Sequence, residues 1–161
     1  MNNDLAAAKK ALRLEMQQQL RTLTTEDRQS LSDEICERVL EMTQWAEAES
    51  VILFSPLPSE PIITPLKLDC EVRKVSFINI SQSSRNEAEL NLPDAVDLIL
   101  VPGLAFSKDR HRLGRGGGFF DRLLAGRAAK AFKLGVCFSL QLLDSIPIEP
   151  HGVAMDAVVT N

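Results

Sequence analysis

Residues 97–121 read DLILVPGLAFSKDRHRLGRGGGFFD. An uninterrupted apolar run over 98–101 ends at Pro102, and four glycines stand among residues 114–118, before an amphipathic segment begins at Phe119. The run has the length and continuity of a strand that is buried on both faces. A strand, a polar glycine-rich loop and a helix in this order predict an α/β unit. Its loop would lie at the carboxyl end of the strand, where ligands bind in such sheets.

The segments around this unit show the same mixture of helices and strands. Apolar residues that recur every four positions predict a helix over 4–22, and a second helix is expected from a cap at Thr24 to about Met42. Shorter helices are expected at 63–68 and 119–129, and strands at 51–54, 72–80, 96–101, 132–138 and 153–159. We therefore predict one α/β domain over 1–161. Its mostly parallel sheet would carry helices on both faces, a three-layer, Rossmann-like architecture.

Composition narrows the class of protein. The 161 residues have a net charge of −4, and with seven Phe, one Trp and no Tyr they argue against general nucleic-acid binding. Cys36, Cys70 and Cys137 are far apart and form no C-x-x-C pair, which predicts reduced, buried thiols rather than disulfides or a zinc site. The sequence shows neither a signal peptide nor a membrane helix, so we expect a cytoplasmic protein without membrane contact.

The glycine-rich loop is the strongest candidate for chemistry. Glycines let successive backbone amides surround an anion, and residues 107–127 hold six Lys and Arg against two Asp in an otherwise acidic chain. This favours a phosphate site over a mobile surface loop, although neither G-x-x-x-x-G-K-[ST] nor G-x-G-x-x-G is present. Asp121 is either a Mg²⁺ ligand beside bound phosphates or an ordinary acid in the first turn of a helix.

The loop and its neighbours resemble one known family, the 5-formyltetrahydrofolate cyclo-ligases. That family has an apolar strand, then P-G-x-x-F and R-L-G-x-G-x-G-Y-Y-D, which stand here as residues 102–106 and 112–121. Three further places are similar: Lys9 and Arg13 for K-x-x-x-R, residues 60–64 for E-x-x-T, and the last strand up to Thr160. The resemblance covers most of the chain.

The resemblance implies a reaction and a set of site residues. The reaction is the Mg²⁺- and ATP-dependent cyclisation of 5-formyltetrahydrofolate to 5,10-methenyltetrahydrofolate, carried out by a monomer or homodimer. Arg115 and Glu60 would be catalytic, Asp121 would hold the metal, and Phe54, Ser55 and Glu60 would line the folate site. The nucleotide contacts would be Lys9, Lys10, Arg13, Arg112, Leu113, Gly114, Arg115, Gly116, Gly117, Gly118, Phe119 and Phe120.

Structural roles remain open for several of these residues: a core ring for Phe54, a solvated loop acid for Glu60, and a solvated helix edge for Lys9 and Arg13. The chain also departs from the family pattern. It has a short connection over 81–93, Phe119-Phe120 for the tyrosine pair and Gly152 for an aspartate. The alternatives are a nucleotide- or phosphate-binding relative without the folate reaction, and a protein acting on another phosphorylated small molecule.

Overall fold

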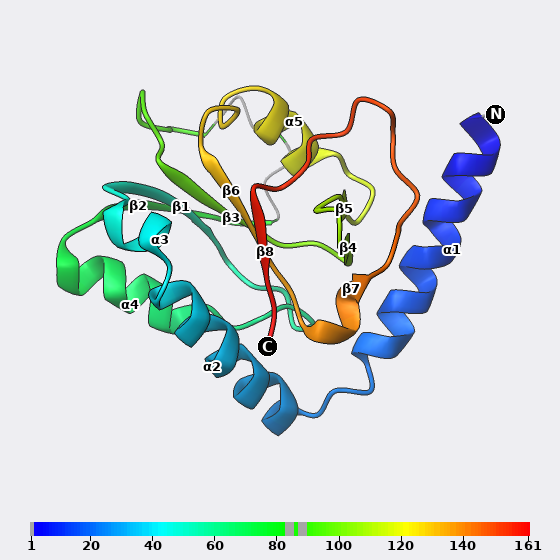
Figure 1. Ribbon diagram of the computed structural model, residues 1–161, viewed down its shortest axis with the longest axis horizontal. Coiled ribbons are helices and arrows are strands. Elements are labelled where there is room, and N and C mark those ends of the chain that lie inside the picture. Colours follow the sequence, from blue (N-terminus) through cyan, green and yellow to red (C-terminus); the bar gives the residue numbers. More distant parts are fainter. Residues whose placement is uncertain (1, 83–85, 87–89) are drawn as a thin grey trace.

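The computed structural model describes residues 2–82, 86 and 90–161 (Figure 1). The helices are α1 (Asn2–Leu20), α2 (Thr25–Leu40), α3 (Thr43–Glu47), α4 (Thr64–Arg73) and α5 (Phe119–Ala125), with a 3₁₀ turn at Ser139–Gln141. The strands are β1 (Ser50–Phe54), β2 (Ser76–Ile80), β3 (Leu98–Val101), β4 (Ala105–Ser107), β5 (Arg112–Leu113), β6 (Phe132–Val136), β7 (Leu142–Leu143) and β8 (Ala157–Val159).

Five parallel strands form the central sheet in the order β2-β1-β3-β6-β8. The chain runs from β1 outward to β2, returns to β3 on the other side of β1, and continues outward through β6 to β8. This is the order of a doubly wound α/β sheet, and its direction reverses between β1 and β3. The predicted α/β class with a mostly parallel sheet is confirmed.

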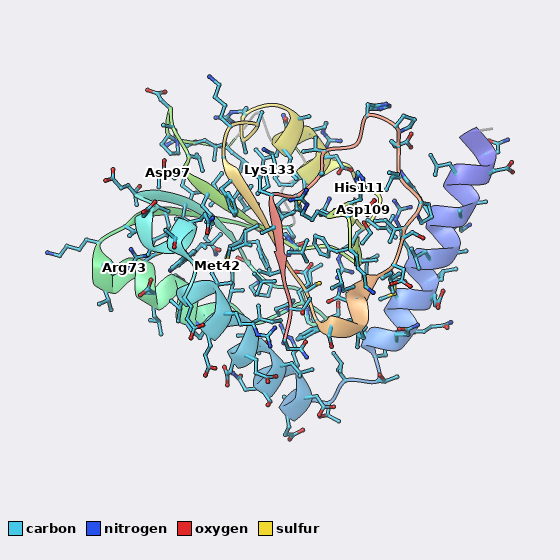
Figure 2. All side chains as sticks on the ribbon, viewed as in Figure 1. Met42, Arg73, Asp97, Asp109, His111 and Lys133 are labelled. Carbon is cyan, nitrogen blue, oxygen red and sulfur yellow. The ribbon has the colours of Figure 1, made fainter. Side chains whose placement is uncertain are left out.

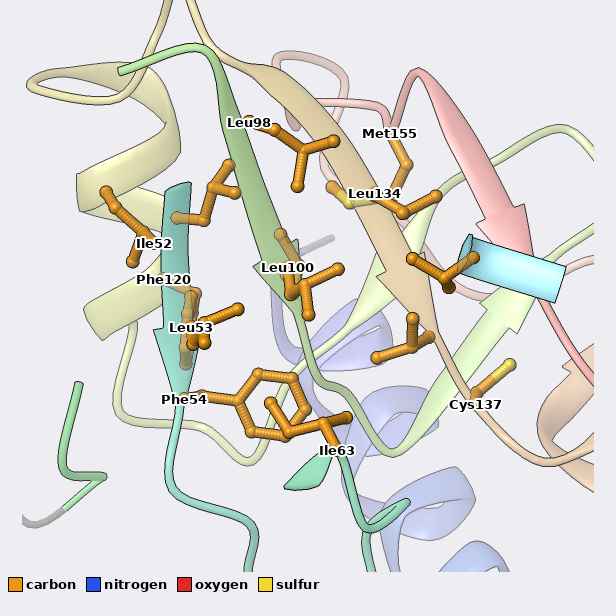
Figure 3. Close-up of a cluster of buried hydrophobic side chains, with 14 of the residues drawn as sticks. Ile52, Leu53, Phe54, Ile63, Leu98, Leu100, Phe120, Leu134, Cys137 and Met155 are labelled. Atoms are coloured by element: carbon orange, nitrogen blue, oxygen red, sulfur yellow. The ribbon is translucent and has the colours of Figure 1, made fainter. Parts of the chain in front are cut away.

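The central strands are apolar on both faces because both faces are covered. All of β3 and residues 51–54 of β1 are buried. Helices α2, α3 and α4 gather on one side of the sheet in Figure 1, whereas α5 lies on another side. Figure 3 shows Ile52, Leu100 and Leu134 from three neighbouring strands packed into one cluster, with Phe54 near the end of β1.

Helix α2 starts at the capping residue that the sequence predicts. The Thr24 side chain accepts a hydrogen bond from the Asp27 backbone N–H at 3.0 Å, and the Asp27 carboxylate accepts one from the Thr24 N–H at 3.0 Å. The two residues form a capping box, which satisfies two of the free amides at this helix end.

We expect Thr24→Ala to lower the free energy of unfolding by about 1 kcal/mol, because the Asp27 amide loses its acceptor. Urea denaturation followed by circular dichroism measures the change. Thr43→Ala is a matched control, because Thr43 lies at the start of α3, where Met42 is the capping residue and makes no side-chain cap. Equal losses in the two variants would contradict the cap.

Three predicted boundaries differ by several residues from the structure. The strand expected at 72–80 begins at Ser76, because α4 continues to Arg73 and ends at Lys74 in the left-handed conformation, with φ of 60°. Val72, which suggested a strand, is 80% exposed on that helix. The helix expected to reach residue 129 ends at Ala125, and the last strand starts at 157 rather than 153.

A second, small sheet was not predicted. Its order is β5-β4-β7, with β4 and β5 antiparallel and β4 and β7 parallel. It folds the polar stretch after β3 back on itself, so that the glycine-rich loop leaves β5 beside the end of β3. Helix α1 lies next to this sheet in Figure 1 and buries Met16 and Leu20.

The three cysteines are free and buried, as predicted. Burial raises the pKa of Cys137 to about 12 and that of Cys36 to about 12, whereas an unfolded thiol titrates near 9.0. Both thiols therefore stay protonated in the folded chain at pH 9, where an unfolded chain begins to lose protons. The free energy of unfolding should thus fall as the pH rises above 9.

We expect maleimide to leave these three cysteines unmodified at pH 7.5 and to modify all of them in urea, because the reagent attacks the exposed thiolate. Mass spectrometry of the intact protein counts the added groups. A rapidly modified cysteine in the native protein would contradict the buried placement.

In the described ranges, none of the helices is long and apolar enough to cross a membrane.

Candidate functional site

A cleft of about 140 Å³ lies at the carboxyl ends of β1 and β3, where the strand order reverses. The switch point is the position at which doubly wound sheets bind ligands. The lining comes from the segments after β1, β2 and β3 and from the glycine-rich loop. It consists of Leu57, Glu60, Gln82, Pro102, Gly103, Arg112, Gly114, Arg115, Gly117, Gly118, Phe119, Phe120 and Asp121.

The glycine-rich loop has a backbone that only glycine adopts without strain at two positions. Gly116 has φ of 110°, and Gly118, which caps α5, has φ of 74°. No atom lies within 4 Å of the place that a Gly117 Cβ would occupy, so this part of the loop faces open space. Helix α5 has seven residues, which is a short helix for an anion site built on a helix dipole. The loop itself and the arginines around it are therefore the main recognition elements.

Arg112 is a buried cation at the base of the cleft. Its side chain is 7% exposed, its Nε donates to the Pro102 carbonyl at 2.6 Å, and its Nη1 lies 3.3 Å from Asp121 Oδ1. The guanidinium also lies 5.2 Å from the centre of the Phe120 ring. Burial lowers the pKa of Arg112 to about 10, which leaves it charged at neutral pH. An anionic ligand in the cleft would meet a charge that little water screens.

Arg115 and Glu60 face each other across the cleft. Arg115 Nε lies 3.5 Å from Glu60 Oε2, and Arg115 Nη2 donates to Ser59 Oγ at 3.0 Å. The Arg115 side chain is 31% exposed, whereas Glu60 is 1% exposed. Among the described residues Glu60 Oε2 has no hydrogen-bond partner, although it is buried. A buried acceptor of this kind is costly unless a ligand or a bound water donates to it.

Two residues that the sequence analysis missed fix Glu60. Gln82 Nε2 donates to Glu60 Oε1 at 2.5 Å and to the Ser55 carbonyl at 3.0 Å. Arg28 on α2 donates to the Glu60 carbonyl at 2.7 Å and to the Leu57 carbonyl at 3.0 Å. Neither residue belongs to a motif, so only the packing of α2 and β2 around the loop reveals them.

A second cavity of about 440 Å³ adjoins the first and shares Arg112 and Asp121 with it. Its other lining residues are Lys9, His111, Ala125, Pro147, Ile148, Glu149, His151, Gly152 and Val153. Lys9 pairs with Glu149 at 3.1 Å, so α1 closes one wall of the cavity. Figure 2 shows His111 close to Asp109, and their side chains are 3.7 Å apart. The two histidines of the chain, His111 and His151, thus both line this cavity.

The structure brings only some of the predicted site residues together. Arg13 reaches the loop, where its Nε donates to the Gly114 carbonyl at 2.9 Å, whereas Lys10 is exposed and Leu113 is buried in the core. Phe54 is 1% exposed, and with Ser55 it borders a third hollow rather than the cleft of Glu60. Phe119 and Phe120 pack edge to face, with ring centres 5.3 Å apart.

Asp121 is the carboxylate that the sequence analysis assigns to a metal. No cluster of three or more His, Cys, Asp or Glu suited to a metal ion occurs in the described part of the chain. Asp121 is 69% exposed and borders both cavities. Mg²⁺ takes one or two carboxylates when phosphate oxygens and water supply the other ligands, so this donor set fits a metal that arrives with a polyphosphate.

Fold and site together define a doubly wound α/β protein with a basic, glycine-lined cleft at the switch point of its sheet. A model of the 5-formyltetrahydrofolate cyclo-ligase family matches residues 64–161, more than half of the chain. The chain therefore belongs to the 5-formyltetrahydrofolate cyclo-ligase family, a family of ligases, as the sequence motifs predict.

Individual relatives agree with this assignment. A 5-formyltetrahydrofolate cyclo-ligase of Mycolicibacterium smegmatis is 53% identical over 64 residues, which cover 40% of this chain and 33% of that protein. The enzyme of Mus musculus is 26% identical over 189 residues and covers 95% of this chain and 93% of its own length. The solved 5,10-methenyltetrahydrofolate synthetase of Mycoplasma pneumoniae has the same fold, with a TM-score of 0.79 at 24% identity, over 94% of this chain and 98% of that chain.

Proposed function

We propose that this chain catalyses the ATP-dependent cyclisation of 5-formyltetrahydrofolate to 5,10-methenyltetrahydrofolate, with release of ADP and phosphate. The family assignment supports the reaction class. The observation that carries the proposal is the cleft at the switch point. There the buried carboxylate of Glu60 faces the guanidinium of Arg115 beside a glycine-rich loop. The comparisons do not favour a relative that has lost the folate reaction.

The proposed reaction needs two bond-forming steps. The formyl oxygen attacks the γ-phosphorus of ATP, and the bond to the β-phosphate oxygen breaks, so that ADP leaves. N10 of the folate then attacks the formyl carbon and loses its proton. The carbon–oxygen bond breaks, the ring closes, and phosphate leaves with the former formyl oxygen. Such a transfer depends on positioning and on the stabilisation of charge rather than on covalent help from the protein.

The arginines and the glycine-rich loop would bind the phosphates of ATP. Arg115 can move its exposed guanidinium toward a transferring phosphoryl group, while Arg112 supplies a fixed buried charge beneath it. Lys9, Lys10, Arg13 and residues 112–120 remain the proposed nucleotide contacts, and the 440 Å³ cavity beside Lys9 is the larger space for a nucleotide. Asp121 would hold Mg²⁺, and the metal would neutralise part of the phosphate charge.

The carboxylate of Glu60 would contact the folate substrate. Its Oε2 has no hydrogen-bond partner in the described part of the chain, so it can accept from an N–H of the pterin ring or stabilise positive charge as the formyl group is activated. Ser55 and Phe54 remain proposed folate contacts, although they border the neighbouring hollow. The partners are thus two small molecules, ATP and a reduced folate, and a cytoplasmic location stays a prediction.

The test mixes the purified protein with MgATP and 5-formyltetrahydrofolate and follows the absorbance of the methenyl product. We expect product and phosphate to appear in equal amounts, and neither to appear when ATP or the folate is omitted. Calorimetry measures the binding of each ligand alone. No product at high protein concentration, together with ATP binding but no folate binding, would overturn the proposal in favour of a nucleotide-binding relative.

Gln82→Leu should raise KM for 5-formyltetrahydrofolate about tenfold and leave KM for ATP unchanged. The substitution removes the donor to Glu60 Oε1, and a hydrogen bond to a charged group is worth about 1.5–3 kcal/mol. Steady-state kinetics with each substrate varied in turn separates the two constants. Gln19→Leu on α1, where Gln19 donates to the exposed Glu15, is the control. Equal effects on both KM values would contradict a role on the folate side.

A further inference from the structure

One arginine outside the cleft holds the backbone of the turn that carries Glu60. Arg28 Nε donates to the Glu60 carbonyl at 2.7 Å, and its Nη2 donates to the Leu57 carbonyl at 3.0 Å. The two bonds come from one planar guanidinium, so they fix the distance and the angle between the two carbonyl groups. The side chain is partly buried against the turn, and burial lowers the pKa of Arg28.

Two further hydrogen bonds lie within the turn itself. The Glu60 N–H donates to the Leu57 carbonyl at 2.9 Å, and the Leu57 N–H donates to Glu60 Oε1 at 2.8 Å. The second of these bonds orients the carboxylate from within the turn, because the side chain of Glu60 folds back onto the amide of Leu57. The separation of residues 57 and 60 therefore contributes, together with the Gln82 donor, to the orientation of the carboxylate.

Helix α2 provides a fixed base for this contact. Arg28, Ser32 and Cys36 recur every four residues and so lie on one face of the helix. Ser32 Oγ accepts from the Ile62 N–H at 2.9 Å, and Cys36 Sγ contacts the Ile62 carbonyl at 3.3 Å. One face of α2 thus holds both ends of the segment 57–62, and of these three residues Arg28 is the one next to Glu60.

We propose that Arg28 is a positioning residue for the folate side of the site, acting through the 57–60 turn to keep Glu60 Oε2 directed at the substrate. This role rests on the proposed function. Arg28 also supplies a positive charge near the buried carboxylate of Glu60, in addition to the charges of Arg115 and Arg112. Displacing a catalytic carboxylate by about 1 Å can lower the rate roughly 10²-fold. Replacing a residue that sets the position of the carboxylate should therefore change the kinetic constants.

The experiment compares Arg28→Met and Arg28→Lys with Arg38→Met. Arg38 lies on the same helix and also donates to a backbone carbonyl, that of Thr160 at 3.1 Å, and neither residue lines the cleft. Each variant is characterised by its melting temperature, its kcat and its KM for 5-formyltetrahydrofolate and for ATP. Arg28→Met should lower kcat/KM for the folate by roughly 10–100-fold, within the range for a misplaced group, and leave KM for ATP within about twofold.

The two other variants separate positioning from stability. Arg28→Lys should recover part of the loss, because an ammonium group reaches one carbonyl but cannot bridge two. Arg38→Met should lower the melting temperature without changing either KM. If Arg28→Met is too unstable to assay, Arg28→Lys carries the test through a severalfold rise in KM for the folate alone.

The outcomes that overturn the role are distinct from those that overturn the function. An active parent protein whose Arg28 variants lose only melting temperature, or lose affinity for both substrates equally, refutes the positioning role and leaves the proposed reaction intact. A parent protein that forms no methenyl product refutes the proposed function, and the positioning role falls with it.

Discussion

Arg115→Ala should lower kcat for methenyltetrahydrofolate formation by roughly 10³-fold or more, the scale on which an arginine acts at a transferring phosphoryl group. Arg115 is suited to this work because its side chain is 31% exposed and is held by Ser59 and Glu60 rather than by the core. The melting temperature should change little, since the side chain fills no buried space. Rapid-quench measurement of phosphate release gives the rate, and thermal unfolding gives the melting temperature.

Two further variants sharpen this result. Arg115→Lys keeps the charge but loses the planar pair of donors, so it should recover only part of the rate. Arg21→Ala, at an exposed arginine just beyond α1, is the control and should leave kcat unchanged. A large fall in the melting temperature of Arg115→Ala with an unchanged kcat would show that the residue serves the fold instead.

Glu60→Gln should lower kcat/KM for 5-formyltetrahydrofolate by roughly 10²–10³-fold, the usual cost of removing one preorganised electrostatic group. The amide is close in shape to the carboxylate and can still accept from the Leu57 N–H through its oxygen. What it lacks is the negative charge beside Arg115. Calorimetry should show that ATP binding persists.

The control for Glu60→Gln is Glu71→Gln, at an exposed position on α4. It changes the net charge by the same amount and should leave kcat/KM unaltered. If Glu60→Gln kept the activity of the parent, the buried carboxylate would be a structural acid, and another group would have to activate the folate.

The large elements of the fold could be predicted because each leaves a strong local pattern. Residues 98–101 are apolar without interruption, and the capping residues at Thr24 and Asp27 mark the start of α2. Helix α3 and strands β4, β5 and β7 are two to five residues long, too short for a periodicity to develop. Their formation depends on contacts with distant segments, which a local pattern does not record.

The site was predictable to the extent that one motif contains it. The glycines and arginines of residues 112–121 predicted the loop as a site, whereas no sequence pattern indicated a role for Arg28 or Gln82. Arg28 looks like an ordinary solvated residue on an amphipathic helix, and its contact with residue 60 joins positions 32 residues apart. Gln82 meets Glu60 only because β2 and β1 are neighbours in the sheet.

The buried charge of Arg112 should make the thermal stability of the protein depend on the charge of a bound anion. The folded chain keeps that guanidinium out of water, and this burial lowers its pKa to about 10 although the exposed carboxylate of Asp121 lies 3.3 Å away. A triphosphate that settled against the guanidinium would relieve the cost of this burial. The melting temperature should therefore rise with the charge of the bound ligand, in the order AMP, ADP, ATP. Inorganic pyrophosphate should also raise the melting temperature more than AMP does.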